Sequence, residues 1–538
     1  MSGKRTLLVL AACFATATVL AGVLFLNSGL AAGRTVYTQL SVLTEVLSYV
    51  TDNYVEKVEP EDLVDGAIKG MLDKLDPHSN YLDPERFKRM QERNRGAYYG
   101  IGVEFDIVDG NLTVITPIAG SPSEKLGIRP GDVIVKIEGE NAKGIKQEDV
   151  FTKLRGERGT VVHVTIRRPG EKDLLEFDIV RDEIPIYSVP NSFMLQPGVG
   201  YIRLVRFSST TSDELEEALG KLEAQGMEKL LLDLRGNAGG YLNEAIEVSD
   251  LFLPGGKKIV YTLGRIPDSN EEYFSTGRAK HTQYPLIVLI DHSSASASEI
   301  VSGAMQDWDR GLIVGQRSFG KGLVQRQYPL KNGGALLLTV ARYYTPSGRL
   351  IQRDYSDKER YIEETAEQID EELQEQADTS STPPPVYHTA AGRTVYGGGG
   401  ITPDVKLDQR FPWTRLQGEL SRAYFDFANL YIGETSFRPA SFESFRRYEV
   451  GDDVIQRFES YLKTKKIEYE PDSLKAQMDL VRHGIKREMA RNLWGDNERW
   501  NVLMDEDPQI QEALALMPQA ELMARHETTT GEWQTHSR

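Results

Sequence analysis

The chain has 538 residues, which is too long for one hydrophobic core, so several domains are expected. Its composition, 40% hydrophobic and 27% charged, excludes wholesale disorder. The 80 acidic side chains outnumber the 63 basic ones, and the resulting net charge of -17 disfavours nucleic acid as a partner because it repels phosphate.

The N-terminus has a pattern of its own. Lys4 and Arg5 precede an uncharged run of about twenty residues, 7–26, which is long enough to span a bilayer. The small residues 31–33 resemble a signal-peptidase site. Residues 1–33 are therefore predicted to be a signal peptide or, if uncleaved, a membrane anchor. The protein is therefore expected to be exported, with a membrane anchor as an open alternative.

Two regions with different periodicity follow. Residues 34–96 place apolar side chains at helical spacing and are predicted to form a small helical region. The pattern then changes to short alternating runs bounded by glycines, at 102–107, 112–115, 133–137 and 161–167. Residues 97–182 are therefore predicted to form a compact β-rich module.

Strands and helices alternate in residues 183–410, which favours crossover units on a largely parallel sheet. Strands are expected at 199–204, 229–234, 286–290 and 335–344 and through residue 314, and helices at 211–224, 242–251 and 296–308. An acidic, polar stretch at about 354–392 is expected to be an insertion, and residues 411–538 a helical extension without a chemical motif.

Two segments of this region place small polar residues where a buried strand meets a helix. Residues 230–240, LLLDLRGNAGG, end in a glycine-rich turn that can point backbone N–H groups at an anion. Residues 290–299, IDHSSASASE, place serines at the start of a helix, in the positive field of its N-terminus. A serine there is more often only a helix cap, so the serine alone does not indicate catalysis.

A lysine that could serve as a base lies downstream, in the segment SFGKGLVQ at 318–325. Lys321 lies between two glycines and before apolar residues, so its side chain could enter a confined pocket. Burial disfavours the charged ammonium and lowers the pKa of a lysine, which would let it deprotonate a serine. A glycine-lysine-glycine surface turn is the alternative for this tripeptide alone.

The chain resembles the C-terminal processing peptidases, or tail-specific proteases, of family S41 across roughly residues 37–407. The matching segments occur in the family's order: YYGIGVEF at 98–105, SPSEKLGIRPGDVIVKIEG at 121–139, LLLDLRGNAGG, SSASASEIVSGAMQD at 293–307, GQRSFGKGLVQ at 315–325, YYTPSGRLIQ at 343–352 and GITPDV at 400–405. The implied fold is α/β and multidomain, with a PDZ domain at 97–182 before a crotonase-like α/β peptidase core.

The resemblance also implies the roles of individual residues. Ser296 corresponds to the nucleophile, Lys321 to its general base and Gln325 to the glutamine that orients the lysine. Backbone N–H groups of Gly239 and Ala297 are expected to form the oxyanion hole. Such a serine-lysine dyad needs neither a cofactor nor a metal ion.

Substrate choice is expected to lie in the PDZ domain. The segment Tyr99, Gly100, Ile101, Gly102 and Val103 resembles a carboxylate-binding loop, whose N–H groups bind a terminal carboxylate while the peptide adds a strand to the sheet. The expected partners are therefore proteins with free C-terminal tails. A homo-oligomer and a membrane contact through an uncleaved N-terminus stay open.

Three other readings are weighed against this one. A catalytically silent, membrane-tethered PDZ scaffold would have no need of both Ser296 and Lys321. A Ser-His-Asp hydrolase using His292 and Asp291 is disfavoured because residues so close to the serine would rarely fold back as a triad. A metalloprotease is disfavoured because no histidines have HExxH spacing, and the only cysteine, Cys13, lies in the N-terminal apolar run.

Overall fold

The computed structural model describes residues 36–525 except 279, 282, 359–360, 362–383, 408–413 and 436. The predicted signal or anchor segment and most of the acidic stretch lie outside the described residues. Within the described part, no helix is long and apolar enough to cross a membrane. The chain divides into two compact units, Met1–Tyr81 and Leu82–Arg538.

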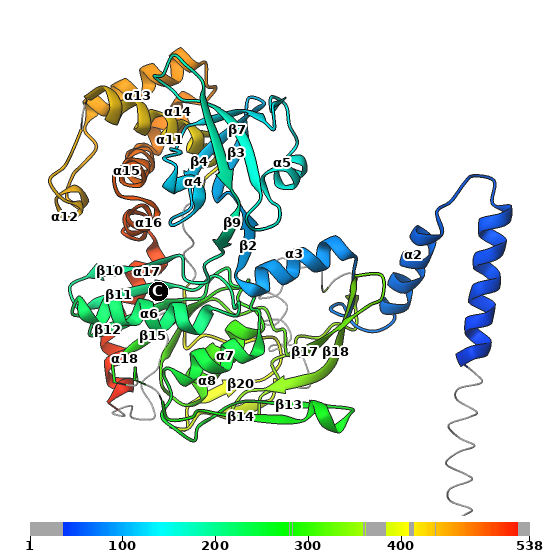
Figure 1. Cartoon of the computed structure of the whole chain (residues 1–538). Coiled ribbons are helices and arrows are strands. Elements are labelled where there is room, and N and C mark those ends of the chain that lie inside the picture. The colour runs from blue at the N-terminus through cyan, green and yellow to red at the C-terminus, as the bar shows by residue number, and fades with distance from the viewer. Residues whose placement is uncertain are drawn as a thin grey trace, which may run out of the picture. The chain divides into compact units, whose positions relative to one another are not determined.

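Helices form where the sequence has helical spacing before the β-rich module. Residues 36–53 are helical in the first unit, followed by α2 (Pro60–Leu72). The second unit begins with α3 (Pro84–Arg95), which Asp83 caps by accepting a hydrogen bond from the Arg86 N–H. Both α2 and α3 begin at a proline, whose fixed φ suits the first turn of a helix and whose missing N–H costs nothing there (Figure 1).

The β-rich module is an antiparallel sheet with the strand order β3-β4-β5-β7-β8. Its strands are β3 (Val103–Val108), β4 (Asn111–Pro117), β5 (Val133–Ile137), β7 (Val161–Arg167) and β8 (Leu175–Val180), with β6 (Glu140–Asn141) beside β5. The helices α4 (Pro122–Lys125) and α5 (Gln147–Leu154) complete it. At its two ends, β2 (Ala97–Gly100) pairs antiparallel with β9 (Asp182–Pro185), so the chain enters and leaves the module side by side.

The sheet of the α/β core has the order β10-β11-β12-β15-β16-β21. Its strands are β10 (Asn191–Gln196), β11 (Val199–Arg203), β12 (Lys229–Asp233), β15 (Leu286–Ile290), β16 (Leu312–Gly315) and β21 (Val405–Lys406). The strands from β11 to β21 are parallel and β10 is antiparallel. All residues of β15 are buried, which is why this strand reads as a continuous apolar run without alternation.

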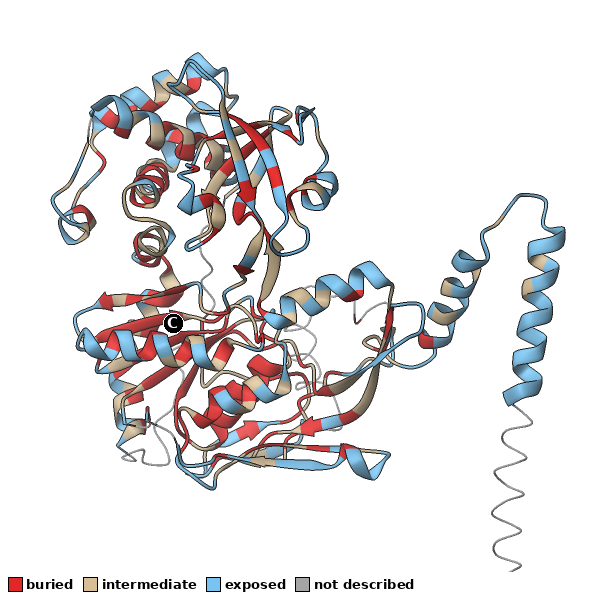
Figure 2. Ribbon diagram, in the orientation of Figure 1, coloured by how far each residue is buried: buried red, intermediate tan, exposed pale blue. Residues whose placement is uncertain are grey.

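Helices cover both faces of this sheet, as Figures 1 and 2 show. Leu230 and Leu232 of β12 pack in one core cluster with α6 (Thr211–Ala224), α7 (Leu242–Asp250) and α8 (Ala297–Asp307). Leu231, which points to the opposite face, packs in a second cluster with α16 (Asp496–Met504), α17 (Pro508–Ala515) and α18 (Met517–Ala524). The C-terminal helices therefore complete the core on the second face of this sheet.

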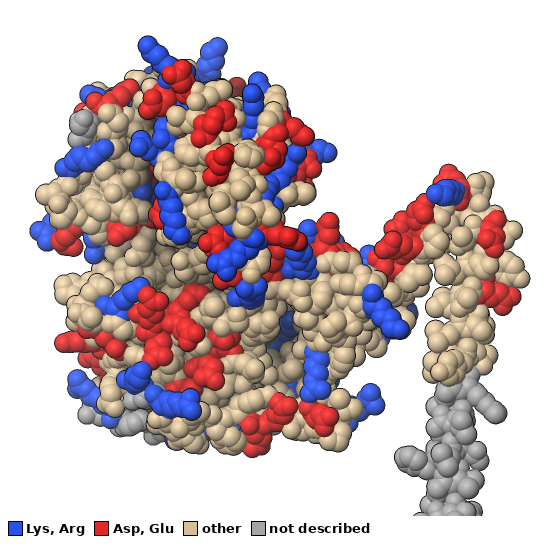
Figure 3. Space-filling view, viewed as in Figure 1, with Lys and Arg blue, Asp and Glu red and all other residues tan. Residues whose placement is uncertain are grey.

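A second, antiparallel sheet lies beside the first and contains β13 (Lys258–Gly264), β14 (Glu271–Phe274), β17 (Leu323–Pro329) and β18 (Ala335–Tyr344). The remaining helices, α11 (Arg415–Thr435), α12 (Phe442–Arg446), α13 (Asp452–Lys465), α14 (Pro471–Ala476) and α15 (Met478–Trp494), share an aromatic-rich core of their own. Over the face drawn in Figure 3, acidic and basic side chains are interspersed, with acidic ones gathered over α6.

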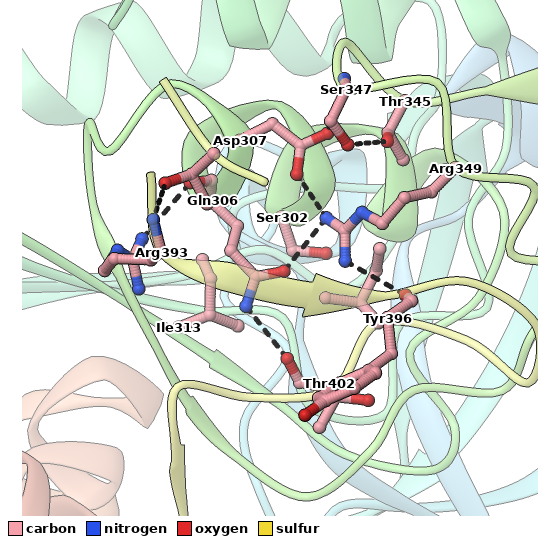
Figure 4. Close-up of polar contacts among 12 residues, drawn as sticks. Ser302, Gln306, Asp307, Ile313, Thr345, Ser347, Arg349, Arg393, Tyr396 and Thr402 are labelled. Carbon is pink, nitrogen blue, oxygen red and sulfur yellow. Dashed lines mark hydrogen bonds and ion pairs between the residues drawn. The ribbon is translucent and has the colours of Figure 1, made fainter. Parts of the chain in front are cut away.

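A buried polar network joins three of the quoted sequence motifs beneath the C-terminal end of α8 (Figure 4). The Arg349 guanidinium is fully buried and donates to the Asp307 carboxylate and to the Gln306 amide oxygen. Gln306 in turn donates to Asp404 at 2.9 Å, and Arg393 pairs with Asp404 as well. Arg393 is followed by β20 (Thr394–Tyr396), which forms a hairpin with β19 (Val386–His388), so the end of the predicted insertion belongs to the core.

Candidate active site

Ser296 lies at the turn between β15 and α8, at the N-cap position of the helix. Its backbone has φ 55° and ψ -111°, a region that residues other than glycine rarely occupy. Such a conformation costs on the order of 1–3 kcal/mol and persists only where surrounding contacts impose it. The Ser296 N–H donates to the Glu299 carboxylate at 2.8 Å, which is one such contact.

Lys321 lies in the turn that precedes β17 and is half-buried. Its Nζ donates to Gln325 Oε1, on β17, at 3.0 Å. The turn is fastened to the serine loop as well, because the Phe319 N–H donates to the Ser294 carbonyl at 3.0 Å. The structure thus brings Lys321 and Gln325 into direct contact and links their segment to the one that carries Ser296.

Glu299 connects the two segments and was not singled out from the sequence. Its side chain is fully buried, and its carboxylate accepts from Ser318 Oγ at 2.6 Å and from the N–H groups of Gly320, Lys321 and Ser296 at 2.7, 2.9 and 2.8 Å. Burial raises the pKa of Glu299, and these hydrogen bonds counteract that rise. Because all four partners are donors, the bound form is the ionised carboxylate. The Ser-x-x-Glu spacing of a capping box was the sequence signal for it.

Tyr343 joins the same two residues through their carbonyl groups. Its hydroxyl lies 2.6 Å from the Lys321 carbonyl oxygen and 3.1 Å from that of Ser296. Burial raises the pKa of Tyr343 well above its ordinary value, so the hydroxyl keeps its proton and serves as a donor. Glu299 and Tyr343 together fix the backbones of Ser296 and Lys321 from both sides.

The glycine-rich turn after β12 lies directly against the serine. A Cβ on Gly239, whose φ is 92°, would lie 2.6 Å from the Ala295 carbonyl oxygen and 2.8 Å from the Ser296 Cβ, so no larger residue fits. The Gly239 N–H donates to Asn237 Oδ1 at 2.9 Å in this conformation. Ala297 is the first residue of α8, and its N–H therefore has no acceptor within the helix.

Asn237 and two serines hold this turn in place. The buried Asn237 donates to the Leu204 carbonyl at 2.8 Å, and its own carbonyl accepts from the Ala295 N–H and from Ser298 Oγ. Ser294 Oγ donates to the Leu234 carbonyl at 2.9 Å. Ser294 and Ser298 are buried and serve as structural donors, so the exposed Ser293 is the suitable comparison for Ser296.

Asp291, weighed above as a triad member, is engaged within its own loop. Its carboxylate accepts from the N–H groups of Gly236 and Ser293, each at 3.0 Å. A cavity of about 570 Å³ opens beside this loop. It is lined by Arg203, Asp233, Arg235, Gly236, Asp291, His292, Ser293, Gln316, Trp500, Leu503, Met504, Asp507 and Gln509, and thus by neither Ser296 nor Lys321.

The predicted carboxylate-binding loop of the β-rich module is divided by the structure. Tyr99 and Gly100 lie in β2 and pair with β9, Ile101 and Gly102 form the turn, and Val103 is the first residue of β3. The Ile101 and Gly102 carbonyls accept from the Ser123 and Ser121 hydroxyls at 2.7 and 2.9 Å. In a trans peptide the C=O of one residue and the N–H of the following residue point in opposite directions. Since the Ile101 and Gly102 carbonyls face α4, the N–H groups of Gly102 and Val103 face away from it.

The strand β3 continues from this turn and carries Phe105. Among the strands that the structure describes, β3 pairs with β4 alone, so its other edge can accept a further strand. Phe105 on β3 and Phe151 on α5 lie with ring centroids 5.4 Å apart. Gly102 has φ 77°, and a Cβ there would lie 2.2 Å from the Ser121 Cβ, so this turn requires glycine.

Comparisons with known proteins show the family of the chain. The profile described as peptidase family S41 matches residues 198–359, and a PDZ domain profile matches residues 113–168. A carboxy-terminal-processing protease of Bartonella bacilliformis is 39% identical over 320 residues, which are 59% of this chain and 73% of that protein. The chain belongs to the carboxy-terminal-processing proteases of peptidase family S41. It is accordingly a serine-type endopeptidase with a PDZ domain.

Further matches extend beyond the catalytic segment of this S41 protease. Carboxy-terminal processing protease CtpB of Bacillus subtilis is 39% identical over 307 residues, 56% of this chain and 64% of that one. Residues 26–86 match the profile of the activating protease CtpB N-terminal domain, and residues 422–495 match a family of unknown function. A solved photosystem II D1 C-terminal processing protease is 29% identical, covering 68% of this chain and 86% of that chain, with a TM-score of only 0.35.

Proposed function

We propose that this S41 protease cleaves proteins near their C-termini with a Ser296–Lys321 dyad, after its PDZ domain has bound the free tail. One observation carries the proposal most: Glu299 and Tyr343 tie the backbones of Ser296 and Lys321 together, while Gln325 accepts from the lysine Nζ at 3.0 Å. A silent scaffold would have no use for this arrangement.

The chemistry follows from these positions. Neutral Lys321 takes the proton of Ser296 Oγ as the oxygen attacks the peptide carbonyl carbon. The Ala297 N–H meets the oxyanion, and the Gly239 N–H joins it by exchanging its bond to Asn237. The lysine then protonates the departing amine, leaving an acyl-enzyme, and afterwards activates the water that hydrolyses the ester.

Tail capture is assigned to the turn at 101–103 and the open edge of β3. The N–H groups of Gly102 and Val103 would bind the terminal carboxylate, and the preceding residues of the substrate would extend along β3 as an added strand. Phe105 and Phe151 offer an apolar surface for the last side chain of the tail. The preferred substrates are therefore chains with a free, apolar C-terminus.

The protein's place in the cell and its assembly are further parts of the proposal. The apolar run at 7–26 supports export to the periplasm or cell envelope, by a cleaved signal or with an anchor in the inner membrane. We also propose the crotonase-like architecture for the α/β core and a homo-oligomer on the resemblance to the family.

The dyad is tested by replacing its members one at a time. Ser296→Ala and Lys321→Ala should each lower turnover of an unfolded protein substrate about a thousandfold or more, because each removes a group that acts in the transition state. Ser293→Ala and His292→Ala are the matched controls from the same loop and should keep most of the activity. An active Ser296→Ala protein would refute the nucleophile, and an inactive His292→Ala beside an active Lys321→Ala would favour the triad.

A further inference from the structure

Arg235 belongs to the glycine-rich turn after β12, and its side chain extends from that turn to the C-terminal helices. It follows β12 by two residues and binds Asp233 through two nitrogens, with Nε–Oδ1 at 2.9 Å and Nη2–Oδ2 at 2.7 Å. The same guanidinium reaches the C-terminal extension, where Nη2 lies 2.9 Å from Asp507 Oδ2 and Nη1 donates to Gln509 Oε1 at 2.8 Å. Four of its contacts thus come from two regions nearly three hundred residues apart in sequence.

Asp507 caps the N-terminus of α17 and also pairs with Arg235. As the N-cap, it accepts from the N–H groups of Gln509 and Ile510 through Oδ1, while Oδ2 binds Arg235. Asp507 and Gln509 are only 3% and 5% exposed, so their contacts with Arg235 are largely buried at the wall of the cavity described above. Charge-assisted hydrogen bonds in such a place are stronger and more directional than those on a surface.

Arg235 neutralises the buried carboxylates that surround it, Asp233 and Asp507. Asp233 is buried and also accepts from Tyr201 Oη at 2.8 Å. Burial would raise the pKa of Asp233, but the charge of Arg235 and its hydrogen bonds hold that pKa below the ordinary value. Among the described ion pairs, Arg235 is the one cation that pairs with Asp233 and with Asp507, and both of these carboxylates are buried.

The turn that Arg235 anchors is the one against the serine. Between Arg235 and Gly239 lie Gly236, whose N–H donates to Asp291, and Asn237, whose carbonyl accepts from the Ala295 N–H. Gly239 itself is held by its N–H bond to Asn237 Oδ1 and by the Phe207 N–H, which donates to the Gly239 carbonyl, while Arg235 anchors the start of the same turn. An error of a fraction of an ångström at Gly239 would displace a donor from the oxyanion, which is costly for catalysis.

We propose that Asp507 and Gln509, at the start of α17, are positioning residues of the peptidase, which hold Arg235 and through it the oxyanion turn. This inference rests on the proposed roles of Ser296 and Gly239. It makes the C-terminal helices a part of the catalytic apparatus as well as a cover for the sheet. Neither residue contacts the reacting atoms, so their effect is on transition-state binding through the turn.

The test replaces Asp507 by asparagine in the full chain. Asparagine caps a helix as well as aspartate does, so α17 is kept while the charge facing Arg235 is removed. We expect kcat to fall about tenfold with KM nearly unchanged, because the loss falls on the transition state. The inhibition constant of a peptide boronate, whose adduct with the serine is tetrahedral, should rise by about the same factor.

Asp505→Asn is the matched control. Asp505 lies two residues earlier and pairs with Arg446 at 2.6 Å on the surface, away from Arg235. Gln509→Met removes the other side-chain acceptor that α17 offers to Arg235 and keeps a similar side-chain volume. It should lower kcat severalfold, and it tests the same inference if the Asp507 variant does not fold. Thermal unfolding of each variant is recorded so that all rates are compared on folded protein.

The outcomes separate this inference from the proposal that it builds on. It is overturned if both variants match Asp505→Asn in kcat and boronate affinity, or if they raise KM alone. The dyad itself fails by a different result, retained cleavage by Ser296→Ala in the same assay. A parallel change in kcat and boronate affinity confined to Asp507→Asn and Gln509→Met is the result we expect.

Discussion

At the residue scale, the site depends on backbone positions as much as on the dyad side chains. Ser296 and Lys321 are proposed as the dyad from the short motifs that surround them, and the structure places Gln325 in contact with the lysine. Glu299 and Tyr343 could not be assigned from the sequence, since their importance comes from hydrogen bonds to the backbones of residues far apart in sequence. The strained φ of Ser296 is likewise a tertiary property that no motif states.

Glu299 gives the site a defined dependence on pH. Burial raises the pKa of Glu299 above the ordinary 4.5, so mild acid protonates it while exposed glutamates are still charged. A proton on this carboxylate displaces one of its four donors and loosens Ser296 and Lys321. We therefore expect activity to fall on the acid side at a pH above that at which exposed glutamates titrate.

Stability should respond to the same titration with the opposite sign. A carboxyl whose pKa is higher in the folded state binds its proton more tightly there, so acidification through this group favours folding. Activity should consequently be lost while the fold persists, which circular dichroism and peptide cleavage measured at the same pH values would show. Glu299→Gln should be poorly active at every pH and should lack the part of the acid limb that Glu299 adds to the loss caused by protonation of the general base Lys321. An acid limb that is unchanged in Glu299→Gln would refute the assignment.

At the element scale, the strands and helices of the core lie close to the expected ranges, because buried parallel strands and amphipathic helices carry strong local patterns. The helix at 211–224 and the strands at 286–290 and 335–344 have the expected bounds. The strands β10, β13, β14 and β17 were not anticipated. Their residues are only partly apolar, and they are fixed by pairing with distant strands.

The network beneath α8 makes a prediction at this scale (Figure 4). Arg349→Met would leave the Asp307 carboxylate, which is 1% exposed, without its cation, and breaking such a buried pair costs about 3–5 kcal/mol. Urea unfolding followed by tryptophan fluorescence should show the loss, since Trp308 directly follows Asp307.

Arg415→Met is the matched control, because it removes an exposed pair with Glu419 that is worth about 0–1 kcal/mol. Equal unfolding midpoints for the two variants would contradict the role given to Arg349.

At the scale of the whole molecule, the order of the parts could be predicted from changes in periodicity and from the motifs. The location of the C-terminal helices could not. Their composition indicates helix, but only the structure shows that Met504, Ile510 and Met517 pack against the peptidase sheet. The contact of Asp507 with Arg235 could not be predicted either, because no local sequence pattern indicates it. An extension without a motif thus shares a core with the catalytic domain.

In the proposed function, tail recognition joins the PDZ domain to the peptidase. Amidation of a substrate's C-terminus removes the charge that the N–H groups of Gly102 and Val103 would bind. Phe151→Ala would remove an exposed ring that contacts Phe105 beside the open edge of β3. Leu174→Ala, which truncates an exposed apolar side chain just before β8, is the matched control.

The decisive measurement is the ratio of kcat/KM for one unfolded substrate with a free apolar C-terminus to that for the same substrate with an amidated end, determined with the intact enzyme. We expect a ratio of about ten or more, the effect of one lost charge-assisted contact. The ratio should shrink in Phe151→Ala and stay in Leu174→Ala. Equal cleavage of the two substrates by the intact enzyme would contradict a peptidase that selects proteins by their tails.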